Sequence, residues 1–323
     1  MMEEIKVTRN YFIIVNPKAG GGNVKKLWPK IYARLNDLGL NFETFFTQYA
    51  GHAVELSQQI LTKIFANNIE NPIIVIAGGD GTLHETVRGC FKYFGENPDF
   101  PQVPIAVLPV GSGNDFARTA HIPARWEAAL ESILNNDGPR ELTIGHYTDL
   151  LTNNEGVFVN NFGIGFDASV VNVADQSELK SNRFISRFSY MGSVLKVLTT
   201  FKGFPIEFKI PDRNIHFKKT FLFTITNIPY FGGGINIVPQ ASLFDNHLDL
   251  VIIEKPSIIH ILTIVATIFF KKHLSLGYVH HYSLESFIVN SKEKNLAQVD
   301  GEVLSKPKFS LKYDTKKYLF WIK

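Results

Sequence analysis

Cysteine is almost absent from this chain of 323 residues, and so is any large excess of charge of one sign. The single cysteine, Cys90, cannot form a disulfide within the chain and cannot supply the several thiolates of a structural zinc site. This scarcity favours a reducing, cytoplasmic compartment. Thirty-three Lys and Arg residues against thirty Asp and Glu residues give a formal net charge of +3, which is too small to indicate a nucleic-acid partner.

A targeting segment and a long hydrophobic run are also missing. The first ten residues, MMEEIKVTRN, contain two acids and no apolar stretch, so we expect no secretory signal. The longest apolar stretch, Ser257–Phe270, contains a histidine and two threonines and is shorter than the roughly 18–20 residues of a spanning helix. We expect a core helix there. A membrane-docking helix with a basic end at Lys271 and Lys272 is the alternative.

What is present is a globular composition, with 45% hydrophobic residues and 27 phenylalanines. The first 140 or so residues alternate short apolar runs with segments of helical period. Strands are expected at Tyr11–Val15, Asn41–Thr47, Pro72–Ala77 and Pro104–Leu108, and helices at Val24–Leu38, Ala53–Asn67, Thr82–Phe94 and from Asp115. This alternation predicts an α/β domain with a doubly wound, mostly parallel sheet.

After Gly145 the pattern changes to runs rich in Phe, Ile, Val and Thr. These predict strands at Val157–Phe162, Ile206–Ile210, Phe217–Asn227, Leu248–Ile253, Tyr282–Asn290 and Phe309–Leu319, with helices at about 168–200 and 257–273. We therefore predict a mostly antiparallel, β-rich C-terminal domain over residues 141–306. The N-terminal domain would span residues 1–140 and be rejoined by about 307–323.

Three junctions between a strand and a helix in the first domain are rich in glycine. They read NPKAGGG (16–22), IAGGDGTLHE (76–85) and LPVGSGNDFAR (108–118). Glycines let backbone amides approach a phosphate, and the helix that follows adds donors and a partial positive charge. Each loop follows a strand at its carboxyl end, where doubly wound sheets bind ligands. Asp80 inside the second loop indicates a metal or water between it and a phosphate, or else an N-cap.

Two common nucleotide-binding families are disfavoured by what the loops lack. The sequence contains no GxxxxGK[ST] motif, which excludes a Walker-type NTPase. It also has no well-formed GxGxxG followed by an acid for the ribose, which disfavours a dehydrogenase.

In their order and spacing, the three segments resemble the catalytic domain of the diacylglycerol kinase and sphingosine kinase superfamily, and the bacterial soluble lipid kinases match best in length. The resemblance continues through NNFGIGFDASV (160–170) and QVDGE (298–302). GGDGT alone is shared with NAD kinases and phosphofructokinase-like enzymes, whereas GSGNDFAR and the distal DGE separate the lipid kinases from those.

The resemblance implies an active site in the cleft between the domains. Gly78, Gly79, Asp80, Gly81, Thr82, Leu83 and His84 would form the nucleotide phosphate loop, with Asn16, Thr47 and Ser112 as further ATP contacts. Asp80 and Asp115 would organise a catalytic Mg²⁺, Glu302 would be the general base, and Asp300 would support the magnesium network. Relatives often have Asn at the position of His84, whose effect on nucleotide contacts is open.

The resemblance also implies a second, structural Mg²⁺ in a loop that normally reads ALxDGxLDL. Here Ser242–Leu250 reads SLFDNHLDL, so the Ser242 carbonyl, Asp245 and the His247 carbonyl occupy the ligand positions. Asn246 replaces the usual glycine. Asparagine tolerates a left-handed conformation, and we expect the loop to survive.

The function implied is an ATP- and Mg²⁺-dependent lipid kinase whose leading acceptor is diacylglycerol, with a sphingoid base, ceramide or another lipid alcohol as the alternative acceptor. A regulatory nucleotide-binding protein without catalysis and a soluble-substrate kinase of the NAD kinase type are the rival readings. We expect a cytoplasmic protein that associates peripherally with the inner face of the membrane. Family analogy alone suggests a homodimer.

Overall fold

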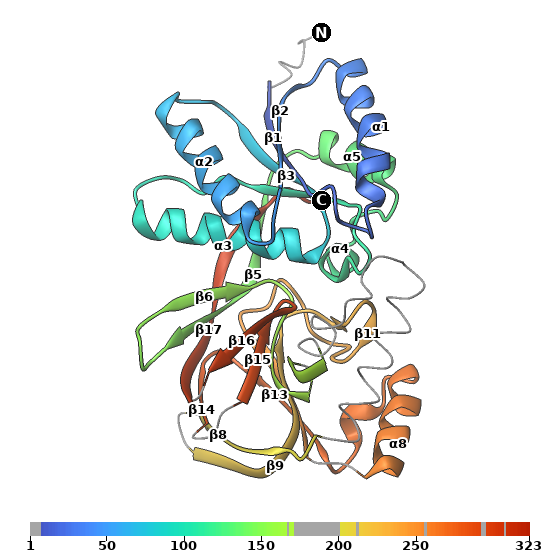
Figure 1. Cartoon of the computed structure of the whole chain (residues 1–323), viewed down its shortest axis with the longest axis vertical. Helices are drawn as coiled ribbons and strands as arrows, with labels where there is room; N and C mark the ends of the chain where they lie inside the picture. Colours follow the sequence, from blue (N-terminus) through green and yellow to red (C-terminus); the bar gives the residue numbers. More distant parts are fainter. Residues whose placement is uncertain are drawn as a thin grey trace. The chain divides into compact units, whose positions relative to one another are not determined.

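The structure is a computed structural model that describes residues 8–166, 168–170, 201–210, 213–254, 257–291, 295–306 and 308–323 (Figure 1). Its contacts divide the chain into two compact units. The first comprises Met1–Leu142 together with Tyr318–Lys323, and the second comprises Thr143–Lys317. Each unit is described by itself.

The first unit is built on a parallel sheet. Its strands are β1 (Asn10–Val15), β2 (Asn41–Phe46), β3 (Pro72–Gly78) and β4 (Ile105–Pro109), in the order β2-β1-β3-β4. The end of β17 (Phe309–Phe320) adds a parallel partner to β4 through Phe320 and Ile105. The chain builds the sheet outward in both directions from β1 and β3. The loops that follow these two strands therefore diverge and leave a crevice at their carboxyl ends.

Helices cover both faces of this sheet (Figure 1). α1 (Asn23–Asp37) and α5 (Trp126–Leu134) pack on one face, against alternate strand residues such as Ile13 and Val75. α2 (His52–Ala66) and α3 (Asp80–Glu96) lie on the opposite face, and the short α4 (Asp115–Thr119) follows β4. The expected doubly wound α/β domain is confirmed. Sequence reasoning did not predict α5.

Cys90 lies on α3 inside this unit and is fully buried. Burial raises the pKa of its thiol to about 12, so it is a neutral packing group near pH 7 rather than a nucleophilic thiolate.

The second unit is β-rich. Its strands are β5 (Arg140–Asp149, shared with the first unit), β6 (Glu155–Phe158), β7 (Asn161–Gly165), β8 (Phe204–Ile210), β9 (Arg213–Thr226), β10 (Tyr230–Phe231), β11 (Ile235–Asn236), β12 (Leu248–Glu254), β13 (Val279–Leu284), β14 (Phe287–Ser291), β15 (Asn295–Val299), β16 (Glu302–Lys306) and most of β17. β9 pairs antiparallel with β7, β8 and β12, and β14 pairs antiparallel with β8 and β17. The expected antiparallel domain is confirmed.

Two expected strands are each broken in two. The run at 157–162 forms β6 and β7, separated at Val159 and Asn160, and the run at 282–290 is shared between β13 and β14. The helix expected at about 168–200 lies almost wholly outside the described residues. The apolar stretch at 257–273 forms α8 (Ile258–Phe269) and a 3₁₀ turn, His273–Ser275. Among the described residues, no helix combines the length and apolar character that crossing a bilayer requires.

The break between β6 and β7 has an identifiable cause in a distant hairpin. β15 and β16 are joined by Asp300 and Gly301, whose φ angles of 47° and 89° are those of a tight two-residue turn. The Asp300 carboxylate accepts hydrogen bonds from the backbone amides of Val159, Asn160 and Asn161 at 2.7, 2.9 and 2.8 Å. These amides are bound by a side chain instead of by a neighbouring strand.

We expect Asp300→Ala to destabilise the second unit, because it leaves three amide donors without their acceptor. Orphaned buried donors cost about 1–3 kcal/mol each before relaxation, so a loss of roughly 3 kcal/mol in the free energy of unfolding is expected. Asp300→Asn keeps one acceptor oxygen and should lose less. Urea unfolding of both variants measures this. Equal unfolding midpoints for wild type and Asp300→Ala would show that the contact does not stabilise the fold.

Candidate active site

The loops that follow the four parallel strands of the first unit meet around one cavity of about 380 Å³. Each strand contributes lining residues from the segment that follows it. The segment after β1 contributes Asn16, Lys18, Ala19 and Gly20, and the one after β2 contributes Thr47, Gln48, Tyr49 and Ala50. The segment after β3 contributes Gly79, Gly81, Thr82 and Glu85, and the one after β4 contributes Gly111 and Ser112. The register places Val15 level with both Phe46 and Ala77, so these strands end side by side. The cavity therefore lies in the crevice that the strand order creates.

Two glycines allow the β3 and β4 loops to touch. A Cβ added to Gly111 would lie 2.4 Å from the Gly79 Cα and 2.7 Å from the Asn114 Oδ1, which is closer than real Cβ atoms come. A side chain at position 111 would push the two loops apart. On the other side of the crevice, the Asn16 Nδ2 donates to the Thr82 Oγ1 at 3.0 Å and joins the β1 loop to the β3 loop.

Acidic side chains on α3 hold the starts of two other helices. The two oxygens of Asp80 accept from the backbone amides of Asp115 and Phe116, both at 3.1 Å, at the start of α4. Glu85 does the same for α2, accepting from Gly51 at 2.8 Å and Ala53 at 3.1 Å. Both contacts place a negative charge at a helix N-terminus, where the helix dipole favours it. Asp80 is thus a helix cap, but for α4 rather than for its own helix.

Helix α3 begins at the cavity without such a side chain, since its N-cap, Gly79, makes no side-chain hydrogen bond. The start of α1 at Gly22 also lacks a side-chain cap, but the amides of Asn23 and Val24 donate to the carbonyls of Gly20 and Ala19. A helix start such as that of α3 binds anions through its backbone amides. Lys18 adds a positive charge on the cavity wall, where its Nζ donates to the Gln48 carbonyl at 3.4 Å.

The structure brings together most of the residues expected to bind ATP. Asn16, Thr47, Gly79, Gly81, Thr82 and Ser112 all line the cavity. Gly78 is the last residue of β3 and directly precedes the lining residue Gly79. Leu83 and His84 are buried on α3 and do not line the cavity.

Asp115 is buried and pairs with Arg118. Sequence reasoning did not assign Lys18 to the site, although Lys18 stands inside the NPKAGGG motif.

The two carboxylates of DGE lie together in the second unit. Asp300 forms the turn of the β15–β16 hairpin, and Glu302 begins β16 opposite Val299, with a partly exposed side chain. The Gly301 amide donates to the Gln298 Oε1 at 2.7 Å. With Asp300 bound to three amides, the hairpin has a fixed position against β7, and Glu302 is held at its end.

The loop expected to hold a structural metal is a tight turn. The Asp245 amide donates to the Ser242 carbonyl at 3.4 Å, and the Asp245 carbonyl accepts from the Thr143 Oγ1 at 2.5 Å. His247 and Asp245 approach through Nε2 and Oδ2 at 3.8 Å. Asn246 does not adopt a positive φ, so the loop forms without the left-handed conformation that glycine would favour.

The donor set of this loop is one carboxylate and nearby carbonyl oxygens, which are ligand types that Mg²⁺ accepts. The described residues contain no cluster of three or more His, Cys, Asp or Glu side chains able to hold a metal. The Lys317 Nζ donates to the Phe244 carbonyl at 3.4 Å and to the Thr143 Oγ1 at 2.8 Å. A positively charged ammonium group is therefore already hydrogen-bonded to a carbonyl of this loop.

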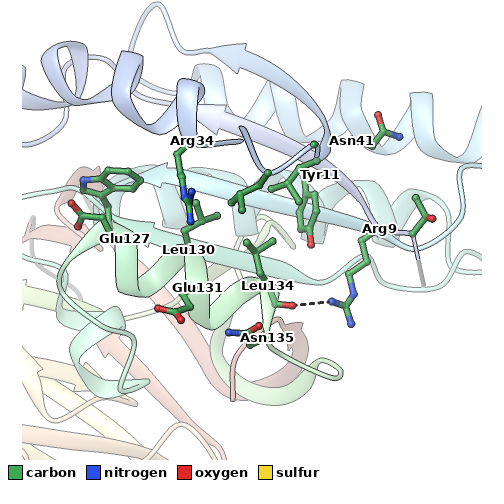
Figure 2. Close-up of a pocket in the computed structure, with 14 residues that line it drawn as sticks. Arg9, Tyr11, Arg34, Asn41, Glu127, Leu130, Glu131, Leu134 and Asn135 are labelled. Carbon is green, nitrogen blue, oxygen red and sulfur yellow. Dashed lines mark hydrogen bonds between the residues drawn. The ribbon is translucent and has the colours of Figure 1, made fainter. Parts of the chain in front are cut away.

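A larger pocket of about 790 Å³ lies at the opposite, amino-terminal end of the sheet, between the last turn of α1 and α5 (Figure 2). Arg9 enters it and donates to the Leu134 carbonyl at 3.3 Å. Glu127 and Glu131 line the α5 side (Figure 2). Arg9 and Arg34 line the pocket too, so its two arginines and two glutamates balance in charge. The carboxyl ends of α1 and α5 lie beside it and carry negative partial charge, whereas the smaller cavity has the amino end of α3 and suits a polyphosphate better.

Comparison with known proteins agrees with this geometry. Residues 10–146 match the family model described as diacylglycerol kinase catalytic domain. Residues 160–313 match the one described as YegS C-terminal NAD kinase beta sandwich-like domain. The two matches together cover the parallel sheet with its loops and most of the antiparallel unit.

Curated relatives cover nearly the whole chain. The candidate lipid kinase YtlR of Bacillus subtilis is 27% identical over 308 residues, 94% of this chain and 96% of the relative. The diacylglycerol kinase of Staphylococcus saprophyticus is 28% identical over 296 residues, 90% of this chain and 88% of that enzyme. A solved structure of a candidate diacylglycerol kinase from Bacillus anthracis shares the fold, with a TM-score of 0.73 at 22% identity over 100% of this chain and 98% of that one. Along nearly its whole length the chain is thus similar to diacylglycerol kinases and related lipid kinases, and each of its two units matches one of the two family models.

Proposed function

We propose that this protein transfers the γ-phosphate of Mg²⁺-bound ATP to the hydroxyl of a membrane lipid, with diacylglycerol as the acceptor and phosphatidic acid as the product. The observation that carries the proposal is the cavity into which all four carboxyl-end loops of the parallel sheet converge. The same reaction is the named activity of curated relatives from Staphylococcus.

The cavity suits a polyphosphate for reasons of charge and access. Gly79, Gly81 and Gly111 present backbone without side chains, and the start of α3, which has no side-chain cap at Gly79, lies on the cavity wall. Lys18 supplies a point charge on the wall. Asn16 and Thr82 already bond to each other and can hold the loops at the spacing that the phosphates require.

The described residues fit a magnesium ion that arrives with its nucleotide. Mg²⁺ commonly keeps several waters and binds through one or two carboxylates plus substrate phosphates, so a preformed cluster of acids is not needed. Asp80 is the carboxylate in the glycine loop, and each of its oxygens accepts one amide, which leaves lone pairs for a metal-bound water. Asp115 is the second acid proposed for this role. When bound, the ion would neutralise the charge that develops on the transferred group.

Glu302 is proposed as the general base. The acceptor oxygen forms a bond to the γ-phosphorus, the bond from that phosphorus to the bridging oxygen breaks, and ADP leaves. The hydroxyl proton passes to the Glu302 carboxylate. Asp300 is proposed to position Glu302 through the β15–β16 turn, because its own oxygens are bound to the amides of residues 159–161.

The acceptor is proposed from the relatives' names rather than from a lipid pocket. Hydrophobic pockets distinguish chain lengths and headgroup analogues weakly. A sphingoid base, ceramide or another lipid alcohol would leave the mechanism unchanged. Since such acceptors reside in membranes, we propose that the protein works from the cytoplasm at the inner membrane surface.

The first test is transfer of radiolabelled γ-phosphate to lipids in mixed micelles, comparing wild type with Glu302→Gln. We expect labelled phosphatidic acid from wild type and a kcat lower by about 10²-fold or more in the variant, with ATP affinity little changed. Glu302→Gln is a cleaner control than Asp80→Ala, which would also uncap α4. Label on another lipid would change the acceptor. Near-normal turnover by Glu302→Gln would remove it as the base, and no label with ATP still bound would favour a regulatory protein.

A second test compares alanine substitutions at two glycines of α3 and asks whether the phosphates of ATP bind in the cavity. A Cβ added to Gly81 meets no atom within 4 Å, and the same holds for Gly95, far from the cavity. Both Gly→Ala changes should leave stability unchanged or raise it by up to about 1 kcal/mol. Gly81→Ala alone should weaken ATP binding, by about tenfold, because its methyl group occupies space proposed for phosphate. Calorimetric titration with ATP and Mg²⁺ checks this. Equal affinities for the two variants would place the phosphates elsewhere.

A third test concerns the structural Mg²⁺ proposed at Ser242, Asp245 and His247. If the ion binds the folded protein, Mg²⁺ without nucleotide should raise Tm, by about 2–4 °C per kcal/mol of binding for a unit of this size. Asp245→Ala should lose that increase, while Glu285→Ala, an exposed acid in the same unit, should keep it. A wild-type Tm that is the same in Mg²⁺ and in EDTA would argue that no ion binds there.

A further inference from the structure

Helix α8 presents a row of large apolar side chains to solvent. Ile259, Leu262, Val265, Phe269 and Phe270 are all exposed, from 51% at Val265 to 81% at Phe269. Their spacing of three, three, four and one places them along one side of the helix. Exposed apolar side chains are common singly, but a contiguous row marks an interaction surface.

The opposite side of α8 is also apolar, and it packs on the second unit. Ile264 is buried, and Ile268 packs against the same cluster of β-strand residues, which includes Phe221, Val251 and Val279. The core-helix expectation therefore accounts for only one side of the segment. The remaining side has no apolar partner among the residues that the structure describes.

The polar groups of α8 are satisfied within the helix and its cap. The Thr263 hydroxyl donates to the Ile259 carbonyl at 2.9 Å, and the Thr267 hydroxyl donates to the Thr263 carbonyl at 2.7 Å. At the start, Ser257 and His260 form a reciprocal capping box. An apolar environment would therefore not leave these hydroxyls without an acceptor, which is the main cost of moving a helix out of water.

The two charged residues that directly follow this face are both positive. α8 contains no Asp or Glu, and Lys271 and Lys272, both exposed, follow Phe270 directly. A second copy of α8 would offer these lysines no carboxylate. The phosphates of an anionic bilayer would, and such a surface attracts lysines that lie close to it.

We propose that the exposed side of α8, with Lys271 and Lys272, docks the protein on the surface of an anionic lipid bilayer. The helix, about 18 Å long, lies in the interface with its apolar row among the acyl chains and its lysines at the headgroups. This deepens the proposed function and rests on it for the reason to visit a membrane. The docking geometry itself stands on α8 alone.

The test is flotation of the whole chain with two kinds of vesicle, one of phosphatidylcholine alone and one that also contains about 30% of the anionic lipid phosphatidylglycerol. Leu262→Glu introduces a charge into the apolar row. Leu151→Glu is the matched control, because Leu151 lies in the same unit, in the turn between β5 and β6, and is 62% exposed against 64% for Leu262. We expect wild type and Leu151→Glu to bind anionic vesicles equally, and Leu262→Glu to bind at least tenfold more weakly. Replacing both lysines with glutamate should abolish the preference for anionic vesicles.

Activity separates this proposal from the kinase function. With a short-chain diacylglycerol dissolved as monomers, Leu262→Glu should turn over at the wild-type rate, whereas with vesicle-borne diacylglycerol its rate should fall with its binding. Equal vesicle binding by wild type and Leu262→Glu would overturn the docking surface and leave the kinase function intact. A wild type that floats through α8 but phosphorylates no lipid would contradict the kinase function and keep the docking surface. A dimer in sedimentation equilibrium that Leu262→Glu dissociates, with unchanged flotation, would assign the face to a second copy and overturn the proposal.

Discussion

Backbone amides bound by carboxylates set the shape of the loops on which the proposed chemistry depends. Asp80 holds the start of α4, Glu85 holds the start of α2, and Asp300 holds the turn between β6 and β7. In each case a side chain distant in sequence satisfies donors that regular secondary structure leaves open. Such charge-assisted bonds are stronger than neutral ones and fix direction as well as distance. The glycine loops can then approach each other closely without depending on side-chain packing.

This arrangement changes how the acids of the motifs are understood. In a sequence, an aspartate between glycines or in DGE suggests metal binding. In the structure, Asp80 and Asp300 are already hydrogen-bonded to amides, so each can serve a structural and a chemical role with the same carboxylate. Loss of activity on removing either acid would not separate these roles. Glu302 differs in its place: it begins β16 directly after the turn that Asp300 fixes, and its side chain is partly exposed.

The sequence predicted the features that arise from local pattern. Apolar runs such as Pro72–Ala77 and the helices between them are set by periodicity, and the loops after β1, β3 and β4 were recognisable from glycine. Contacts between distant segments were out of reach. Nothing near Val159 indicates that Asp300 interrupts the strand there, and the burial of His84 depends on how α3 lies against the sheet. Likewise, an apolar helix has no sequence signal that separates a buried side from an exposed one when both are apolar, as in α8.

The proposed lipid acceptor would account for the exposed side of α8. An enzyme that acts on a soluble molecule gains nothing from keeping large apolar side chains in water, since each lowers solubility and invites association. An enzyme whose acceptor stays in a bilayer must spend time at that surface, and a modest affinity lets it leave and return. The proposed docking through α8 and two lysines would give binding of that order, because the apolar row and the charges would act together but neither is large. The same two contributions would make the binding depend on lipid charge and on ionic strength, which a purely apolar interface would not.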